Sequence, residues 1–171
     1  ETQITNNGGA ERPAVYNDKI VWEHVNGSTA GGDICCQLND VYMYNISTNN
    51  TTRIITGEAN YYRVAIYGDK IVWQSWINGG SDIYVYDLST DKNIQITNNG
   101  RAQYPDIYGD RIVWEDWRNE NADIYLYNIS TSEETQITTD NSNQRYPAIY
   151  GDKVVWEDRN DIYVGNITYV G

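Results

Sequence analysis

The chain has 171 residues, with 16 tyrosines, 6 tryptophans and no phenylalanine, a composition that favours β-strands joined by tight turns. Its 24 acidic residues outnumber the 12 basic ones, and the net charge of −12 disfavours nucleic acid or an anionic membrane as a partner, because phosphate binding needs clustered Lys and Arg. No apolar run is long enough for direct insertion into a membrane, and no window holds a helical period.

From the N-terminus onward, one pattern occurs four times. Residues 1–5 end in Gln-Ile-Thr, the same ending that closes later copies at Thr97 and Thr138. Each copy then has a strand ending in Tyr, a tight Gly-Asp turn (Asn-Asp in the first copy), a strand through a Trp and a strand that begins at an Asp. A closing strand follows in the first three copies. The repeated tryptophans are Trp22, Trp73, Trp114 and Trp156. Their period of about 41 residues, with one insertion, is typical of propeller blades.

We therefore predict an all-β, four-bladed β-propeller made of four-stranded antiparallel blades. The blades cover about 10–56, 57–97, 98–138 and 139–171. The last copy lacks its own fourth strand, so residues 1–5 are expected to complete it and to close the ring. The alternative is a fragment of a larger ring, in which case two chains would associate to close it.

Three motifs carry a resemblance to a known family: Asp-Arg-Ile-Val-Trp at 110–114, Asp-Ile-Tyr-Leu-Tyr-Asn at 123–128 and Gln-Ile-Thr at 136–138. With their equivalents in every copy, they resemble the repeat of the TolB-type, WD40-like propeller family. They are more similar still to tandem propeller repeats of archaeal cell-surface, S-layer-associated proteins. Tyr-Gly-Asp stands where the TolB-type repeat has a Ser-Pro-Asp-Gly turn. The resemblance spans the whole chain and implies a propeller fold, but a shared fold does not transfer a function.

The copies differ most in the loop between their second and third strands, and variable loops of repeat proteins often form the binding face. The second copy carries Trp76 there, and the third carries Trp117 and Arg118. Exposed aromatic side chains stack on sugars or hold partner chains. The alternative is that both tryptophans are packing residues that cover the ends of the blades.

A second candidate group enters the first strands of the four copies at equivalent positions. Its members are Arg12, Arg63, Tyr104 and Tyr146, with Arg145 preceding the last of them. Arg and Tyr around a channel mouth could hold a carboxylate or a sugar acid. Hydrogen bonds and salt bridges between neighbouring blades are the alternative role.

No catalytic residue, metal site or cofactor is predicted. The chain has one histidine, His24, and neither a nucleophile elbow nor a phosphate loop. The aspartates that open the third strands recur in all copies, which favours structural loop bonds over chemistry. A bound cation such as calcium stays open, although no loop has a calcium-ligand series. Cys35 and Cys36 are adjacent and are expected to be free thiols, with an unusual vicinal or an intermolecular disulfide as the alternatives.

Sequons begin at six asparagines and lysine is scarce, which, together with the resemblance, predicts an extracellular, cell-surface location. The sequons are at Asn26, Asn45, Asn49, Asn50, Asn128 and Asn166. We expect a non-catalytic binding or scaffold module of a surface protein, contacting a glycan or another surface protein alongside other domains of its polypeptide. The alternatives are a carbohydrate lyase or hydrolase, or its accessory domain, and a purely structural spacer of a surface layer.

Overall fold

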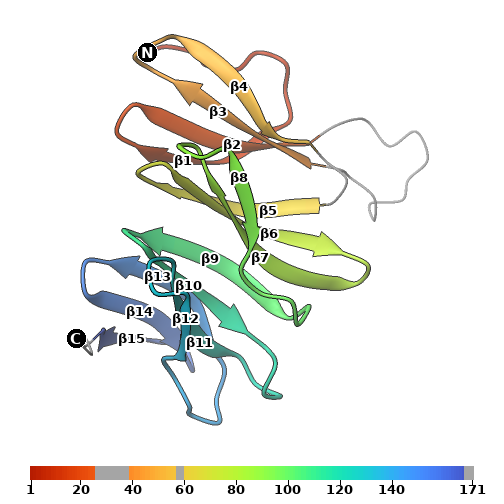
Figure 1. Ribbon diagram of the computed structural model, residues 1–171. Helices are drawn as coiled ribbons and strands as arrows, with labels where there is room; N and C mark the ends of the chain where they lie inside the picture. The colour runs from red at the N-terminus through yellow and green to blue at the C-terminus, as the bar shows by residue number, and fades with distance from the viewer. Residues whose placement is uncertain (26–38, 57–59, 168–171) are drawn as a thin grey trace.

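The computed structural model describes residues 1–25, 39–56 and 60–167, and there the chain forms antiparallel β-sheets that succeed one another in sequence order (Figure 1). Each sheet corresponds to one predicted blade. Blade 1 consists of β1 (Ala10–Tyr16), β2 (Lys19–Val25), β3 (Asn39–Asn45) and β4 (Asn50–Ile55). Blade 2 consists of β5 (Asn60–Tyr67), β6 (Lys70–Ile77), β7 (Gly80–Asp87) and β8 (Lys92–Gln95).

Blades 3 and 4 repeat this order, except that blade 4 has three strands within the described residues. Blade 3 consists of β9 (Ala102–Tyr108), β10 (Arg111–Asp116), β11 (Asp123–Asn128) and β12 (Glu133–Gln136). Blade 4 consists of β13 (Gln144–Tyr150), β14 (Lys153–Asp158) and β15 (Asp161–Asn166). Sequential strands pair with each other in every sheet, which is the meander predicted from the tight turns.

The turn between the first two strands of each blade explains the Gly-Asp motif. Gly68, Gly109 and Gly151 have φ values of 61°, 62° and 61°, in the left-handed region that hairpin turns of two residues require. Asn17 takes the same place in blade 1 with φ 50°. Asparagine is among the residues that tolerate this conformation, so the one departure from the motif keeps the turn.

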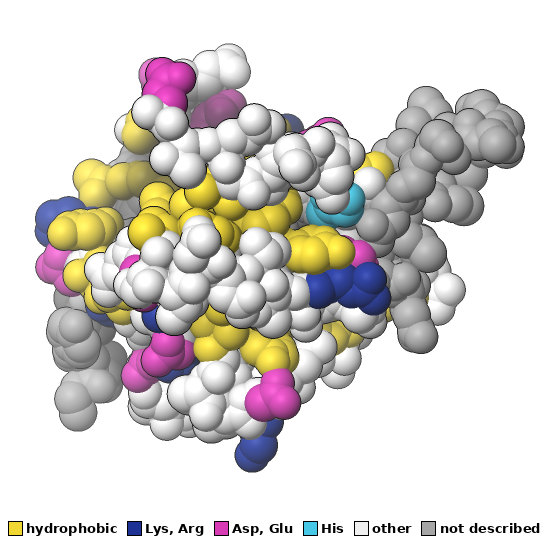
Figure 2. Space-filling view, turned by 90° about the horizontal axis from the view of Figure 1, so that it is seen from above, with side chains coloured by type: hydrophobic (Ala, Val, Ile, Leu, Met, Phe, Trp, Pro, Cys, Tyr) yellow, Lys and Arg dark blue, Asp and Glu magenta, His cyan; other side chains and the backbone are white. Residues whose placement is uncertain are grey.

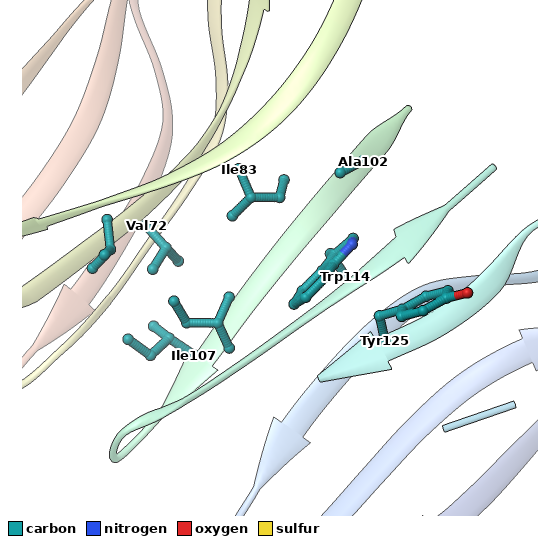
Figure 3. Close-up of a cluster of buried hydrophobic side chains, with 8 residues drawn as sticks. Val72, Ile83, Ala102, Ile107, Trp114 and Tyr125 are labelled. Atoms are coloured by element: carbon teal, nitrogen blue, oxygen red, sulfur yellow. The ribbon is translucent and has the colours of Figure 1, made fainter. Parts of the chain in front are cut away.

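The core lies between successive blades rather than within one of them. Between blades 2 and 3, Val72 and Ile83 face Ile107 and Trp114, and all four are buried (Figure 3). Equivalent clusters join blade 1 to blade 2 and blade 3 to blade 4. The sheets of blades 2 and 3 therefore bury both of their faces, and this explains why their strands have apolar or aromatic residues on both sides.

The two ends of the row of blades leave faces of this kind uncovered. Val15 on blade 1 is 66% exposed, whereas its equivalent in blade 3, Ile107, is buried. Ile162 on blade 4 is 76% exposed, although its equivalent Ile124 is completely buried. The view onto blade 1 shows hydrophobic side chains gathered in the middle of that end face (Figure 2).

The expected ring closure by residues 1–5 is not present in the structure. These residues lie outside the sheets, and the two ends of the chain are at opposite ends of the row (Figure 1). Ile4 and Thr5 instead line a cavity of about 150 Å³ together with Trp22 and Tyr42 of blade 1. The order of the motifs determines the order of the blades along the chain. It does not determine the angle between successive blades, so the motifs do not predict whether four blades close a ring.

No helix in the described part of the chain has the length and hydropathy needed to cross a membrane. The expectations for Cys35, Cys36 and the sequon at Asn26 fall on residues outside the described ranges.

Candidate binding cavity

The first strands of all four blades line one cavity of about 390 Å³. Four residues from equivalent positions reach it: Arg12 from β1, Arg63 from β5, Tyr104 from β9 and Tyr146 from β13. These are the residues that the sequence predicts at the channel mouth, and the structure brings them together. Arg145 is not among the lining residues, although its guanidinium lies 5.6 Å from the ring of Tyr146.

A β-bulge directs each of these residues into the cavity. Their φ values are 47°, 58°, 53° and 52° in chain order, and the strand register shifts at each of them. A non-glycine residue in this conformation costs on the order of 1 kcal/mol, so it needs compensating contacts. The repetition of the bulge in every blade indicates that the compensation is also repeated.

The compensation comes from an acid or amide on the preceding blade. The backbone N–H of Arg63 donates to Glu23 at 2.5 Å, that of Tyr104 to Gln74 at 3.3 Å, and that of Tyr146 to Glu115 at 3.0 Å. Sequence reasoning assigned no role to these side chains and so missed this one. The signal was present, because in every copy an acid or glutamine directly follows the repeated Trp.

The two cavity arginines differ in their partners. Arg12 donates to Glu23 at 2.6 Å, so its charge is neutralised by a buried carboxylate. Arg63 lies 4.6 Å from the centre of the Tyr104 ring, and no ion pair to it is found among the described residues. The Tyr104 ring in turn meets that of Tyr146 edge-on at 4.8 Å. The cavity therefore combines one unpaired cation with two aromatic rings.

Burial raises the pKa of both junction glutamates. For Glu23 the hydrogen bond from Arg12 works against this rise, and for Glu115 the N–H of Tyr146 does. Both side chains are buried between blades, so loss of solvent outweighs those hydrogen bonds.

Asp106 is the one acidic residue among those that line the cavity, and the equivalent positions hold Ala14, Ala65 and Ala148. Its carboxylate accepts the backbone N–H of Ile149 at 2.8 Å, across the junction to blade 4, and its own neighbour's N–H at 2.9 Å. Burial raises the pKa of Asp106 despite these two bonds. Sequence reasoning missed this residue, although an alignment of the four copies shows an Asp where the other three have Ala.

The residues predicted as a binding site on the variable loops are placed differently from one another. Trp76 is 40% exposed near the end of β6. Trp117 is half-buried beside the cavity, where its Nε1 donates to Glu115 at 3.1 Å and the guanidinium of Arg145 lies 5.1 Å from its ring. Arg118 forms ion pairs of 2.6 Å with both Asp116 and Glu134, so its charge is used within blade 3.

Two of the aspartates that open the third strands, Asp82 and Asp123, hold loops, as predicted. Asp82 accepts from the Thr97 hydroxyl at 2.9 Å and from the N–H of Gly100 at 3.1 Å. Asp123 accepts from the side-chain amides of Asn119 and Asn121, both at 3.1 Å. Across the described ranges, no group of three or more His, Cys, Asp or Glu side chains is arranged to hold a metal ion.

The fold of this chain is similar to that of solved β-propeller structures. TolB from Acinetobacter baumannii superposes with a TM-score of 0.68 at 18% identity, covering 92% of this chain and 41% of that one. A protein assigned as TolB from Agrobacterium tumefaciens gives 0.65 at 16% identity, covering 86% and 56%. The β-propeller domain of the Trilobed protease from Pyrococcus furiosus, described as having an open velcro topology, gives 0.65 at 16%, covering 86% and 47%.

The likeness shows the fold. The four sheets are blades of a β-propeller of the kind seen in TolB, and the chain spans about half the length of these structures or less. No protein-family model matches the sequence, and no curated protein matches it. The fold therefore rests on structure, and the function has to be argued from the cavity.

Proposed function

We propose that this chain is a non-catalytic binding module of a cell-surface protein, and that its cavity binds the carboxylate of an acidic surface glycan. The observation that carries the proposal is the guanidinium of Arg63, which has no ion-pair partner among the described residues although acids outnumber bases two to one. In so acidic a chain, a cation left unpaired in a cavity is a site for an anion from outside.

The neighbouring rings fit a sugar acid better than a simple anion. Tyr104 and Tyr146 offer aromatic surface and hydroxyl groups beside Arg63, and Trp117 is linked to Tyr146 because both donate to Glu115. Sugar rings pack against such surfaces, while a guanidinium binds a carboxylate through two parallel hydrogen bonds. Trp76 is a more distant contact for a longer glycan chain.

The surface location rests on the sequons and the scarcity of lysine. Two of the sequon asparagines, Asn45 and Asn128, form side-chain hydrogen bonds that shape the turns between third and fourth strands. Their repetition is therefore explained by turn chemistry as well as by glycosylation. Archaeal surface-layer proteins remain the proposed setting, where this module would stand beside other domains of the same polypeptide.

We also propose that the row of blades is part of a complete ring. The exposed Val15 and Ile162 occupy positions that are buried at every inner junction, so each end face has the chemistry of a half-junction. Charge supports the same view: Lys19 pairs with Asp69 and Lys70 with Asp110 across successive junctions, each at 3.3 Å. Blades of the same kind, from further repeats or from a second copy, would complete the ring and the cavity.

Calorimetric titration with oligogalacturonate tests the binding proposal. The parent should bind it and Arg63→Gln should lose at least about tenfold in affinity, the range expected for one charge-assisted contact. Lys92→Gln is the matched control, because it removes the same charge from an exposed position on β8. A neutral oligosaccharide of equal length should not bind. Equal weakening by both variants would reduce the effect to net charge and refute a specific site.

An enzymatic role is the second candidate, and Asp106 is the observation that favours it, as an acid outside the repeat that lines the cavity. Both of its oxygens already accept backbone N–H groups, which suits a structural role better than proton transfer. Product release from the same oligosaccharides, abolished in Asp106→Asn, would establish catalysis. A pure spacer is the weakest candidate, because neither Trp76 nor Trp117 is fully packed.

A further inference from the structure

A second hollow, of about 470 Å³, lies at the junction between blades 3 and 4 and shares no lining residue with the cavity above. Blade 4 contributes Trp156, Tyr163, Asp158 and Gln144 to its wall. The end of blade 3 contributes the stretch Ile137, Thr138, Thr139 and Asp140. The Tyr163 ring, stacked on Trp156 with centroids 6.3 Å apart, is 44% exposed.

The equivalent place in blade 3 is occupied by the chain's own Arg118. Its guanidinium carbon lies 4.2 Å from the centre of the Tyr125 ring, the counterpart of Tyr163. It also donates at 2.6 Å to the carboxylate of Asp116, the counterpart of Asp158, and at 2.6 Å to Glu134. An aromatic ring and a buried carboxylate at this position are therefore a demonstrated guanidinium site within this fold.

Blade 4 has the ring and the carboxylate but not the arginine above them. Its loop is shorter, and only Arg159 and Asn160 separate Asp158 from Asp161. Both loop residues have positive φ, 52° and 67°, as in a two-residue hairpin turn. Arg159 is mostly exposed, donates to Asp140 at 3.2 Å, and forms with its Nε a long ion pair of 3.9 Å to Asp158 Oδ1, without a hydrogen bond. The place of the Arg118 guanidinium is thus left open.

Two buried acceptors on the wall of this hollow lack hydrogen-bond donors among the described residues. Asp158 is 7% exposed, and its Oδ2 accepts from the Ser142 hydroxyl at 2.9 Å while Oδ1 accepts no hydrogen bond. Gln144 is 1% exposed, and its amide nitrogen donates to Ser142 while its Oε1 has no partner. Buried acceptors are almost always satisfied, so these two oxygens indicate a missing donor.

We propose that this hollow binds the guanidinium group of an arginine side chain from outside the chain. The ligand would lie over Tyr163 and donate to Asp158 Oδ1 and Gln144 Oε1. A guanidinium fits because it is planar, carries five donors and no acceptor, and stacks on aromatic rings. The counterpart of Glu134 would lie on a fourth strand, which blade 4 lacks in the described residues. A guanidinium bound here would therefore form one ion pair fewer than Arg118 forms in blade 3.

The test uses N-acetyl-L-arginine amide as the probe, with the citrulline analogue as an uncharged isostere and the lysine analogue as a compact cation. Binding is measured by calorimetry and by the shift of the Trp156 indole N–H signal in NMR spectra. We expect saturable binding of the arginine probe with a dissociation constant of about 1 mM or tighter. The citrulline analogue should not bind, and the lysine analogue should bind more weakly. A Gly-Arg-Gly peptide binding as well as the probe would show that the site accepts arginine within a chain.

Two variants remove the site by different routes. Asp158→Asn removes the charge while keeping the shape, and Tyr163→Leu removes the ring from a half-exposed position with little risk to folding. Each should weaken binding at least about tenfold, with an unchanged melting temperature for Tyr163→Leu. Arg159→Ala removes a cation that pairs with Asp140 and Asp158 and should strengthen binding or leave it unchanged.

Arg118→Ala supplies a gain-of-function control in the same molecule. It should open the blade 3 site, so that the probe binds with a stoichiometry of two and raises the lowered melting temperature of this variant. The proposal is overturned if the parent does not bind the arginine probe. It is also overturned if the citrulline analogue binds equally well, or if Tyr163→Leu binds as the parent does.

Discussion

Glu115 of blade 3 accepts, at 3.0 Å, the backbone N–H of Tyr146, a blade 4 residue with φ 52°. The acid satisfies a donor that the bulge turns away from its own sheet. The same bond therefore holds two blades together and fixes the direction of a cavity-lining side chain. It links the stability of the fold to the shape of the proposed site.

Replacing Glu115 by Ala should lower the free energy of unfolding by about 2 kcal/mol, because a buried N–H then loses its acceptor. Glu115→Gln should cost much less, since Gln74 fills this role at the previous junction. Urea denaturation of both variants measures the difference. Glu157→Ala is the control, because no described blade follows blade 4, and it should change stability by less than about 0.5 kcal/mol. Equal losses from Glu115→Ala and Glu157→Ala would contradict the junction role.

The buried carboxyl of Asp106 should make stability depend on pH. Its pKa is raised in the folded state, so its contribution is full below about pH 4, near the pKa of an exposed Asp, and is lost as pH rises through the folded value. The stability difference between the parent and Asp106→Ala should therefore shrink from pH 4 to pH 8. Urea denaturation at each pH measures it. The stability difference between the parent and Asp106→Asn, which also cannot ionise, should change with pH in the same way. If the difference between the parent and either variant stays constant with pH, the effect is ruled out.

Trp76 and Trp117 should respond differently to truncation. Trp117→Ala should cost about 2 kcal/mol, because it removes a half-buried ring and its hydrogen bond to Glu115. Trp76→Ala should cost about 1 kcal/mol or less, since the ring is 40% exposed. Thermal unfolding followed by circular dichroism separates the two. If Trp76→Ala is the more damaging, that tryptophan is a packing residue and not a contact for ligand.

The uncovered end faces should make the chain self-associate. Sedimentation equilibrium of the parent should show association that increases with concentration, because the apolar faces of blades 1 and 4 bury each other. Ile162→Glu should suppress it without lowering the melting temperature, and Val15→Glu should do the same from the other end. The same change at Ile124, buried at an inner junction, should unfold the chain. A parent that stays monomeric at its solubility limit would argue against ring completion by a second copy.

The repeat made most of the fold predictable. Trp73 and Trp114 recur because each faces the preceding blade, and the turn at Gly109 recurs because its φ of 62° needs glycine or asparagine. Closure of the ring was not predictable, because it depends on small angles between blades that many weak contacts set together. Residues 1–5 thus carry the motif of a fourth strand without pairing as one.

The cavity was predictable only in outline. Equivalent positions in a repeat point the same way, so the grouping of Arg63 with Tyr104 and Tyr146 could be expected. That Arg12 is paired and Arg63 is not depends on where the Glu23 carboxylate reaches, and spacing along the chain does not contain that information. The hollow beside Asp158 could not be predicted for a similar reason. It arises because the loop after Asp158 is shorter than in blade 3, and a missing residue gives no motif that sequence analysis can assign.

The junctions have one more consequence, for how such a protein can grow. Each copy carries an acceptor for the blade after it and a bulge that donates to the blade before it, so both halves of a junction are encoded in the same stretch of about 41 residues. A gene duplication of that length would therefore insert a blade together with both sets of contacts it needs. Lengthening the array requires no new interaction to evolve, only copying, while substitutions in one blade can then create a site that its neighbours lack.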